Sequence, residues 1–232
     1  MISLQGIRKE YKTPSGSFTA LHGIDLEIRT GEFVAIVGKS GCGKSTLLNL
    51  IGGIDHPSSG ELSVNGTGLR GVSEQSLARW RGRTVGFVFQ FFQLLPTLTV
   101  VENVMLPLDF AGQLPAGQRR KRALELLDRV GLVEQEQKLP SALSGGQQQR
   151  VAIARAMAND PPIVLADEPT GNLDSETSMA VFNLFRALAD GGTTVVIATH
   201  ERDIARVIDR TIEMLDGRIA IPAETRNIEV VR

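Results

Sequence analysis

The stretch FVAIVGKSGCGKSTLLNLI, residues 33–51, decides the fold of this chain. Its first five residues form a continuous apolar run, which predicts a strand buried on both faces. The residues from Ser45 to Ile54 have the pattern of a helix. Between the two, Gly38 to Ser45 match G-x-x-x-x-G-K-[ST] in the strand, loop and helix context that this motif requires. The sequence therefore predicts a loop that binds phosphate.

The residue types in this loop explain how it can hold a nucleotide. Glycines allow backbone N–H groups to surround a β-phosphate, and the helix that follows adds the positive end of its dipole. Lys44 can reach the β- and γ-phosphates, and the Ser45 hydroxyl can bind Mg²⁺. The alternative is an ordinary glycine-rich turn before a helix, and the complete pattern in its proper context makes that alternative weak.

Composition sets the class of protein. The chain has 232 residues, enough for one large domain with a sizeable core. Its 25 Lys and Arg against 26 Asp and Glu give a net charge of -1, which disfavours a globally basic nucleic-acid binder. The single cysteine, Cys42, excludes an internal disulfide framework. No apolar run approaches the roughly 20 residues that cross a bilayer, so we expect a cytosolic chain unless another protein holds it at a membrane.

Alternating strand and helix patterns predict an α/β core. Residues 24–29, IDLEIR, alternate apolar and charged side chains, which indicates an antiparallel sheet near the N-terminus. Three later apolar runs resemble residues 33–37 and predict a mainly parallel sheet. These runs are residues 84–89, 163–166 and 194–198, and the predicted helices between and around the runs are residues 45–54, 100–108, 119–130, 144–158, 175–189 and 201–208.

Residues 93–158 interrupt this alternation, because they contain helical patterns and no strand pattern. We interpret them as a helical subdomain inserted into the α/β core. The predicted organisation is a single domain over residues 1–222, followed by a tail over residues 223–232.

Two adjacent acids, Asp167 and Glu168, end the apolar run at residues 163–166. Because neighbouring residues of a strand point in different directions, their carboxylates can do different work. Asp167 is placed to hold Mg²⁺, and Glu168 to orient or deprotonate an attacking water. His200 follows another buried run at the same predicted sheet edge. The alternatives are acids that only solubilise a strand end and a structural histidine.

The motif LSGGQ, residues 143–147, narrows the class further. Ser144 and Gln147 have the S-x-x-Q spacing of a capping box, which predicts a helix start with a second site for anions. With this motif the sequence resembles the ATP-binding cassette (ABC) family of ATPases, over nearly its whole length and with the motifs in the family's order. The resemblance implies an α/β fold of the P-loop NTPase type, with a mainly parallel core sheet, an N-terminal antiparallel β-subdomain and an inserted α-helical subdomain. It also implies ATP and Mg²⁺ as ligands.

The resemblance assigns roles to individual residues. It implies that Tyr11 stacks on adenine, that Gln90 contacts Mg²⁺ and senses a membrane partner, and that His200 contacts the γ-phosphate. Asp167 and Glu168 match the Walker B aspartate and the catalytic glutamate. Tyr11 as an ordinary strand-end aromatic and Gln90 as an ordinary exposed glutamine are the alternatives. The other implied nucleotide contacts are the Walker A loop (Gly38, Lys39, Ser40, Gly41, Cys42, Gly43, Lys44, Ser45 and Thr46), the signature (Ser144, Gly145, Gly146 and Gln147) and Asp174 of the D-loop.

One branch of the family fits the sequence best. The D-loop reads GNLD, residues 171–174, where the family often has SALD. The segments at residues 86–104, 143–160 and 166–175 are similar to the branch of lipoprotein-release, macrolide-export and cell-division ATPases. Glu201 follows His200 where that branch usually has aspartate, and since the charge is kept we expect little consequence.

Each motif occurs once, and the family completes its sites across a head-to-tail dimer. The resemblance therefore implies a homodimer that encloses two ATP molecules. It also implies a transmembrane permease subunit with few spanning helices and a large extracytoplasmic domain, which would place the chain on the cytoplasmic face of the plasma (inner) membrane. Residues 91–108, FFQLLPTLTVVENVMLPL, are the predicted docking region, unless Phe91 and Phe92 belong to the core.

The sequence contains two basic clusters. Residues 79–83 and 119–122 are rich in arginine and are either lipid-facing or, as we favour, solvated helix faces.

The rival function class is a soluble ABC-type ATPase of DNA repair or chromosome maintenance. Those relatives usually carry long insertions, whereas Lys44 and Ser144 are only 100 positions apart. We therefore expect transport or mechanical signalling, with no nucleic acid as partner.

Overall fold

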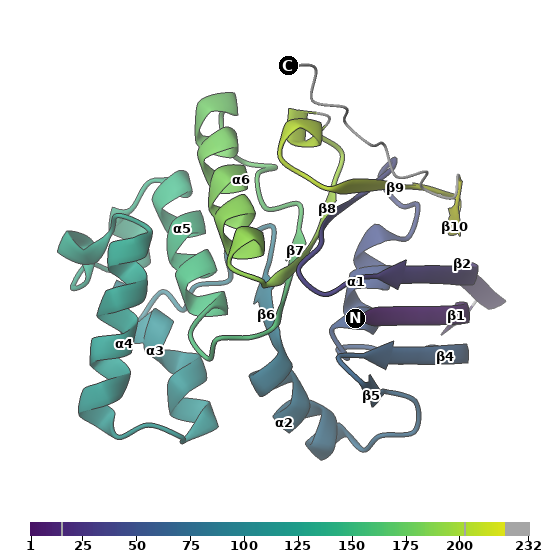
Figure 1. Ribbon diagram of the computed structural model, residues 1–232, viewed down its shortest axis with the longest axis horizontal. Coiled ribbons are helices and arrows are strands. Elements are labelled where there is room, and N and C mark those ends of the chain that lie inside the picture. The colour runs from purple at the N-terminus through teal and green to yellow at the C-terminus, as the bar shows by residue number, and fades with distance from the viewer. Residues whose placement is uncertain (15, 202, 221–232) are drawn as a thin grey trace.

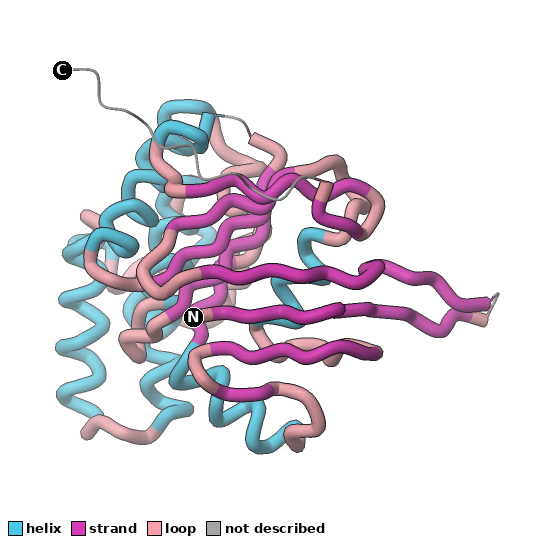
Figure 2. Tube along the Cα trace, turned by 45° about the vertical axis from the view of Figure 1, so that its right-hand side comes forward, coloured by secondary structure: helices cyan, strands magenta, loops and turns pink. Residues whose placement is uncertain are grey.

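The computed structural model describes residues 1–14, 16–201 and 203–220, and the predicted tail at 223–232 lies outside them. Its strands form two sheets (Figure 1). The first sheet is antiparallel, and its β1–β2 hairpin projects beyond the other strands (Figure 2). The predicted N-terminal antiparallel sheet is thus confirmed, and it is larger than residues 24–29 indicated. In the order β2-β1-β4-β5 its strands are Gly16–Ile28, Ile2–Thr13, Ser59–Val64 and Thr67–Gly68.

The second sheet has six strands and is parallel except at one edge, where β10 runs antiparallel to β9. The four predicted apolar runs all form strands of this sheet, because a strand with helices or another sheet on both faces needs apolar side chains on both. The expected mainly parallel core is confirmed. In the order β10-β9-β3-β8-β7-β6 the strands are Arg218–Ile219, Arg210–Leu215, Phe33–Val37, Thr194–Thr199, Ile163–Asp167 and Val85–Val88.

The helices lie on both sides of the parallel sheet. The helices α3, α4 and α5 gather on the side away from the antiparallel sheet, with no strand among residues 93–158 (Figure 1). Two short 3-10 turns, Val133–Gln135 and Pro140–Ala142, link α4 to α5. The six α-helices of the described residues are α1 (Lys44–Ile51), α2 (Glu74–Thr84), α3 (Val100–Ala111), α4 (Ala116–Arg129), α5 (Gly145–Ala156) and α6 (Ser175–Asp190).

The helix predicted at residues 201–208 is wrong. The structure has only a 3-10 turn, Asp203–Arg206, in this region. The reason lies at Asp209, whose N–H donates to the Phe33 carbonyl at 2.8 Å and whose Oδ2 accepts from the Phe33 N–H at 2.8 Å. These two bonds draw the chain into β9 and leave no room for a longer helix.

Two apolar cores cover the two faces of the parallel sheet. On β3, Phe33 and Ala35 belong to the core shared with α3, α4, α5 and α6, whereas Val34 and Ile36 belong to the core shared with α1 and the antiparallel sheet. All four side chains are fully buried. Burial on both faces fixes where β3 ends, and therefore fixes the loop from residue 38 to residue 43.

No helix in the described part of the chain is long and apolar enough to cross a membrane.

A buried asparagine organises the loop that leads into α3. Asn103 is fully buried, and its Oδ1 accepts from the Leu95 N–H at 2.8 Å. Its Nδ2 donates to the carbonyls of Leu95, Leu98 and Thr99 at 3.0–3.1 Å. One side chain thus satisfies four backbone bonds of a loop that has no sheet or helix partner.

We expect Asn103→Ala to lower the free energy of unfolding by about 2–3 kcal/mol, because a buried N–H and buried carbonyls lose their partners. Urea denaturation measures this change. Gln113→Ala, at an exposed position after the same helix, is the matched control. Equal midpoints for the two variants would contradict the assigned role of Asn103.

Candidate functional site

A cavity of about 580 Å³ lies at the carboxyl ends of the parallel strands. Gln90 follows β6, Glu168 follows β7, His200 follows β8, and the 38–43 loop follows β3. Parallel strands bring their carboxyl ends to one edge of a sheet, which is where α/β proteins bind ligands. The structure thus brings these sequence-predicted residues together, and all of them contribute to the cavity lining.

The loop between β3 and α1 has the geometry of a phosphate cradle. Gly43 has φ 103°, and a Cβ on it would lie 2.9 Å from the Leu21 side chain, so no larger residue fits there. The Lys44 ammonium crosses the loop and donates to the Gly38 carbonyl at 2.9 Å. The Cys42 side chain is buried in the core below the loop, so only the backbone of this residue can serve a phosphate.

Glu168 lies between the side chains of Lys44 and His200. Its Oε1 is 3.6 Å from Lys44 Nζ, and its Oε2 is 2.8 Å from His200 Nδ1. Because an ionised carboxylate only accepts hydrogen bonds, His200 Nδ1 donates to Glu168, and the other ring nitrogen stays available. The Glu168 backbone has φ 45°, a left-handed conformation that costs energy for a residue with a side chain. Strain of this kind fits a carboxylate that must aim at one point.

Asp167 has the properties of a cation ligand. Burial raises the pKa of its carboxyl, the Ser45 hydroxyl bond lowers it in part, and the charge of Glu168 raises it again. Its Oδ1 is buried and has no hydrogen-bond partner among the described residues. A buried carboxylate oxygen without a partner, beside a serine hydroxyl, is the donor set that Mg²⁺ prefers. The residues present therefore fit the predicted Mg²⁺ site.

The predicted base-stacking residue, Tyr11, lies beside the cavity and does not line it. Its hydroxyl donates to Asp55 Oδ2 at 2.8 Å. The aromatic residue that does line the cavity is Phe18, which pairs directly with Tyr11 across the β1–β2 hairpin. Sequence reasoning missed Phe18, although its place on the strand that leads to the core residue Leu21 was a usable signal.

A second omission is Asn172, whose Nδ2 donates to the Gln90 carbonyl at 3.3 Å. This bond ties the GNLD segment to the loop that carries Gln90. Asp174, at the end of that segment, caps α6 by accepting from the Thr177 N–H at 2.9 Å. Its carboxylate therefore serves the helix start within this chain and does not line the cavity.

The signature motif forms the predicted capping box, but it lies outside the cavity around the phosphate loop. The Ser144 N–H donates to Gln147 Oε1 at 2.9 Å, and the Gln147 N–H donates to Ser144 Oγ at 3.3 Å. A Cβ on Gly146 would lie 2.5 Å from the Thr177 methyl group, so the motif packs directly against the start of α6. None of Ser144, Gly145 and Gly146 lines the cavity around the phosphate loop.

Known proteins share these features. The family model described as ABC transporter matches residues 21–171. The chain belongs to the ABC transporter family. It is 48% identical to the lipoprotein-releasing system ATP-binding protein LolD of Bacteroides fragilis, over 94% of this chain and 100% of LolD. It is 49% identical to the macrolide export ATP-binding/permease protein MacB of Nitrosomonas europaea, over 97% of this chain and 34% of MacB. A dimeric structure of the ATP-binding cassette MJ0796 with ADP and Pi matches with a TM-score of 0.90 and 44% identity, over 97% of this chain and 98% of MJ0796.

These findings confirm the predicted fold and the predicted activity. The chain is an ABC cassette that hydrolyses ATP, similar to the LolD and MacB ATPases. The spans matched in this chain include the phosphate loop, the signature, Asp167, Glu168 and His200. The roles of individual residues stay predictions, which the geometry above makes specific.

The raised pKa of Asp167 gives a prediction about stability. A carboxyl whose pKa is higher in the folded state than in the unfolded state costs stability at neutral pH, and this cost disappears below its ordinary pKa. We expect Asp167→Asn to raise the melting temperature at pH 7 by a few degrees, by less near pH 4, and to abolish Mg²⁺-dependent turnover. Thermal melts at the two pH values and an ATPase assay test this. A variant that melts below the wild type at pH 7 would contradict it.

Proposed function

We propose that this ATPase powers a membrane complex as a head-to-tail homodimer that encloses two ATP molecules. The observation that carries the proposal is the separation of the two anion-binding motifs in one chain. Lys44 lines the cavity, whereas Ser144 and Gly146 pack beside α6, outside it. A site that uses both motifs needs a second copy. The dimeric state of the similar cassette MJ0796 supports this arrangement.

The groups around Glu168 indicate which contacts change when ATP binds. Before ATP binds, Lys44 and His200 both contact the Glu168 carboxylate. A γ-phosphate carries more charge than a carboxylate and competes for both side chains. Glu168 is then free to hold the attacking water and accept its proton. Bound Mg²⁺, held by Ser45, Asp167 and Gln90, would neutralise phosphate charge.

The same competition between the γ-phosphate and the Glu168 carboxylate explains how hydrolysis reopens the dimer. ATP favours the closed state only if it binds that state more tightly than the open one. The γ-phosphate supplies this difference when Lys44 and His200 contact it from one subunit and the Gly145 and Gly146 N–H groups contact it from the other. Loss of the γ-phosphate removes the contacts, and the subunits separate.

We expect Glu168→Gln to bind ATP, to hydrolyse it at least about 100-fold more slowly, and to remain a dimer with MgATP, because the base is lost while the phosphate contacts are kept. Gel filtration with MgATP and with MgADP measures the dimer. Glu176→Gln, at an exposed position on α6, is the matched control and should stay monomeric after turnover. A monomeric Glu168→Gln with MgATP would contradict the sandwich dimer.

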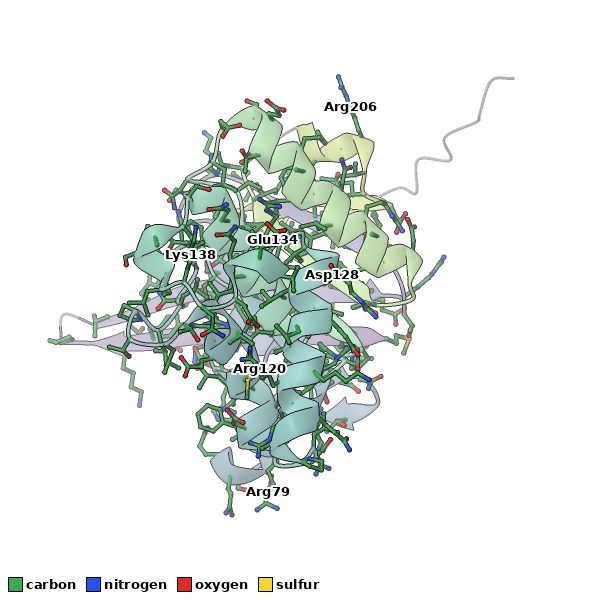
Figure 3. The ribbon with its side chains drawn as sticks, turned by 90° about the vertical axis from the view of Figure 1, so that its left-hand side faces the viewer. Arg79, Arg120, Asp128, Glu134, Lys138 and Arg206 are labelled. Atoms are coloured by element: carbon green, nitrogen blue, oxygen red, sulfur yellow. The ribbon has the colours of Figure 1, made fainter. Side chains whose placement is uncertain are left out.

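The surface that fits a permease is a groove of about 890 Å³ between α2 and α3. Phe110, which is 86% exposed, Leu106 and Pro107 supply apolar surface there. Arg79 and Arg83 supply charge, and neither has an ion pair or hydrogen bond among the described residues. Arg79 lies at the lower edge of the molecule in Figure 3. An amphipathic permease segment with an acidic residue matches this lining.

The groove revises the docking region predicted from the sequence. Of residues 91–108, Leu106 and Pro107 line the groove, whereas Phe91 and Phe92 do not. The second arginine cluster is already paired, as expected for solvated helix faces. Its ion pairs are Arg119 with Asp109, Arg120 with Glu136 and Arg122 with Asp160.

The partner and output are proposed from the relatives. LolD is described as part of a lipoprotein-releasing system, and MacB as an ATP-binding and permease protein in one chain. We propose a separate permease subunit with few spanning helices and a large extracytoplasmic domain, which holds this chain at the cytoplasmic face of the plasma (inner) membrane. The output is lipoprotein release, export or mechanical signalling to that domain.

We expect Phe110→Asp in a Glu168→Gln background to stop co-purification of the permease from detergent-solubilised membranes, because a charge replaces the central apolar contact of the groove. Mass spectrometry identifies the bound proteins. Phe110→Asp alone should keep its basal ATPase activity in solution. Undiminished recovery of a membrane subunit with Phe110→Asp would move the docking site away from this groove, and recovery of nucleic acid instead would favour the rival class.

A further inference from the structure

Strand β2 contributes to the wall of the nucleotide cavity. Phe18 and Ala20 line the cavity there, beside the phosphate loop from Lys39 to Thr46. The register of the β1–β2 pair shifts between Thr19 and Leu21, where Ala20 and Leu21 are both buried, and Phe18 is left as the large exposed side chain of β2 in the cavity lining. A nucleotide whose phosphates occupy the loop must extend its base out of it, and β2 is the wall that carries apolar surface.

Phe18 presents a large exposed ring to the cavity. Its side chain is 58% exposed, although it stands on a sheet whose other side chains supply much of a buried core. Because Phe18 belongs to the cavity lining, its ring supplies apolar surface that a ligand in the cavity can cover. Ser17, Thr19 and the other residues at this end of the hairpin offer no comparable apolar surface.

Tyr11 stands beside Phe18 but is held by other contacts. The two residues are direct cross-strand partners, so their rings share one face of the hairpin. The Tyr11 hydroxyl donates to Asp55, and the Lys9 ammonium lies 4.7 Å from the ring centroid. Lys9 in turn donates to Asp55 Oδ1 at 2.5 Å and to the His56 carbonyl at 2.8 Å. This network fixes Tyr11 against the chain that follows α1 and leaves Phe18 as the free ring.

We propose that Phe18 is a base-binding residue of this ATPase, which contacts the adenine of ATP directly beside the fixed ring of Tyr11. The proposal rests on the nucleotide site described under the proposed function and adds a residue to it. Stacking on an aromatic ring contributes to affinity for any ligand with a base and contributes nothing to a bare polyphosphate.

The test compares a ligand that has a base with one that has none. Calorimetry with Mg²⁺ measures the affinity of ADP and of inorganic tripolyphosphate for the wild type, Phe18→Ala and Phe18→Trp. We expect Phe18→Ala to weaken ADP binding about tenfold with tripolyphosphate unchanged, and Phe18→Trp to restore ADP binding. Val133→Ala, another exposed apolar position, is the matched control and should change neither affinity.

Two outcomes would overturn the proposal. Unchanged ADP affinity in Phe18→Ala would show that the ring does not meet the base. Equal weakening of ADP and tripolyphosphate would show that Phe18 only supports the hairpin, and a lowered melting temperature would accompany it. Lys44→Ala separates these results from a failure of the site itself: it must weaken both ligands, and if it weakens neither, the assigned phosphate loop is wrong whatever Phe18 does.

Discussion

The parallel pairing of β3, β8 and β7 is the constraint on which the rest of the structure depends. Val37 pairs with Thr199, and Asp167 pairs with Ala198, so the three strands end at nearly the same level. The proposed site residues follow these ends: the phosphate loop after β3, Glu168 after β7 and His200 after β8. The register is fixed because a slip of one residue would turn each apolar strand to the wrong core. The packing of the three strands therefore determines where the residues of the site lie.

Several features of the site lower the stability of the folded chain. The buried Asp167 oxygen has no partner among the described residues, Glu168 takes a left-handed backbone, and the Lys44 ammonium is almost fully buried. Each feature opposes folding when considered alone. In the proposed function, a bound cation would supply the missing partner of the Asp167 oxygen, and the γ-phosphate would contact the buried Lys44 ammonium. Binding of MgATP would then offset part of this cost, which is one way in which ATP would influence the conformation of the cassette.

Much of this arrangement follows from the sequence, for reasons that differ between residues. The four apolar strands and the phosphate loop are local signals, because a strand buried on both faces and a glycine at φ 103° each restrict the residue types that fit. The capping box of Ser144 and Gln147 is equally local. The 3-10 turn at Asp203–Arg206 depends on a distant partner, Phe33, and no window of the sequence around the turn contains that information. Phe18 is different, because its partner Tyr11 lies in the same hairpin.

The two anion-binding helix starts of this chain are built differently, which argues for their separate roles. At α1 the cap is Gly43 with no side-chain bond, which supports the proposal that a phosphate in the same chain's cavity accepts from this helix start. At α5 the Ser144 and Gln147 side chains each accept from the other residue's N–H, and the Gln148 N–H donates to the Ser144 carbonyl. Among the described residues the Gly145 and Gly146 N–H groups have no hydrogen-bond partner. Two N–H groups without partners at a helix start support the proposal that α5 binds an anion that another subunit brings.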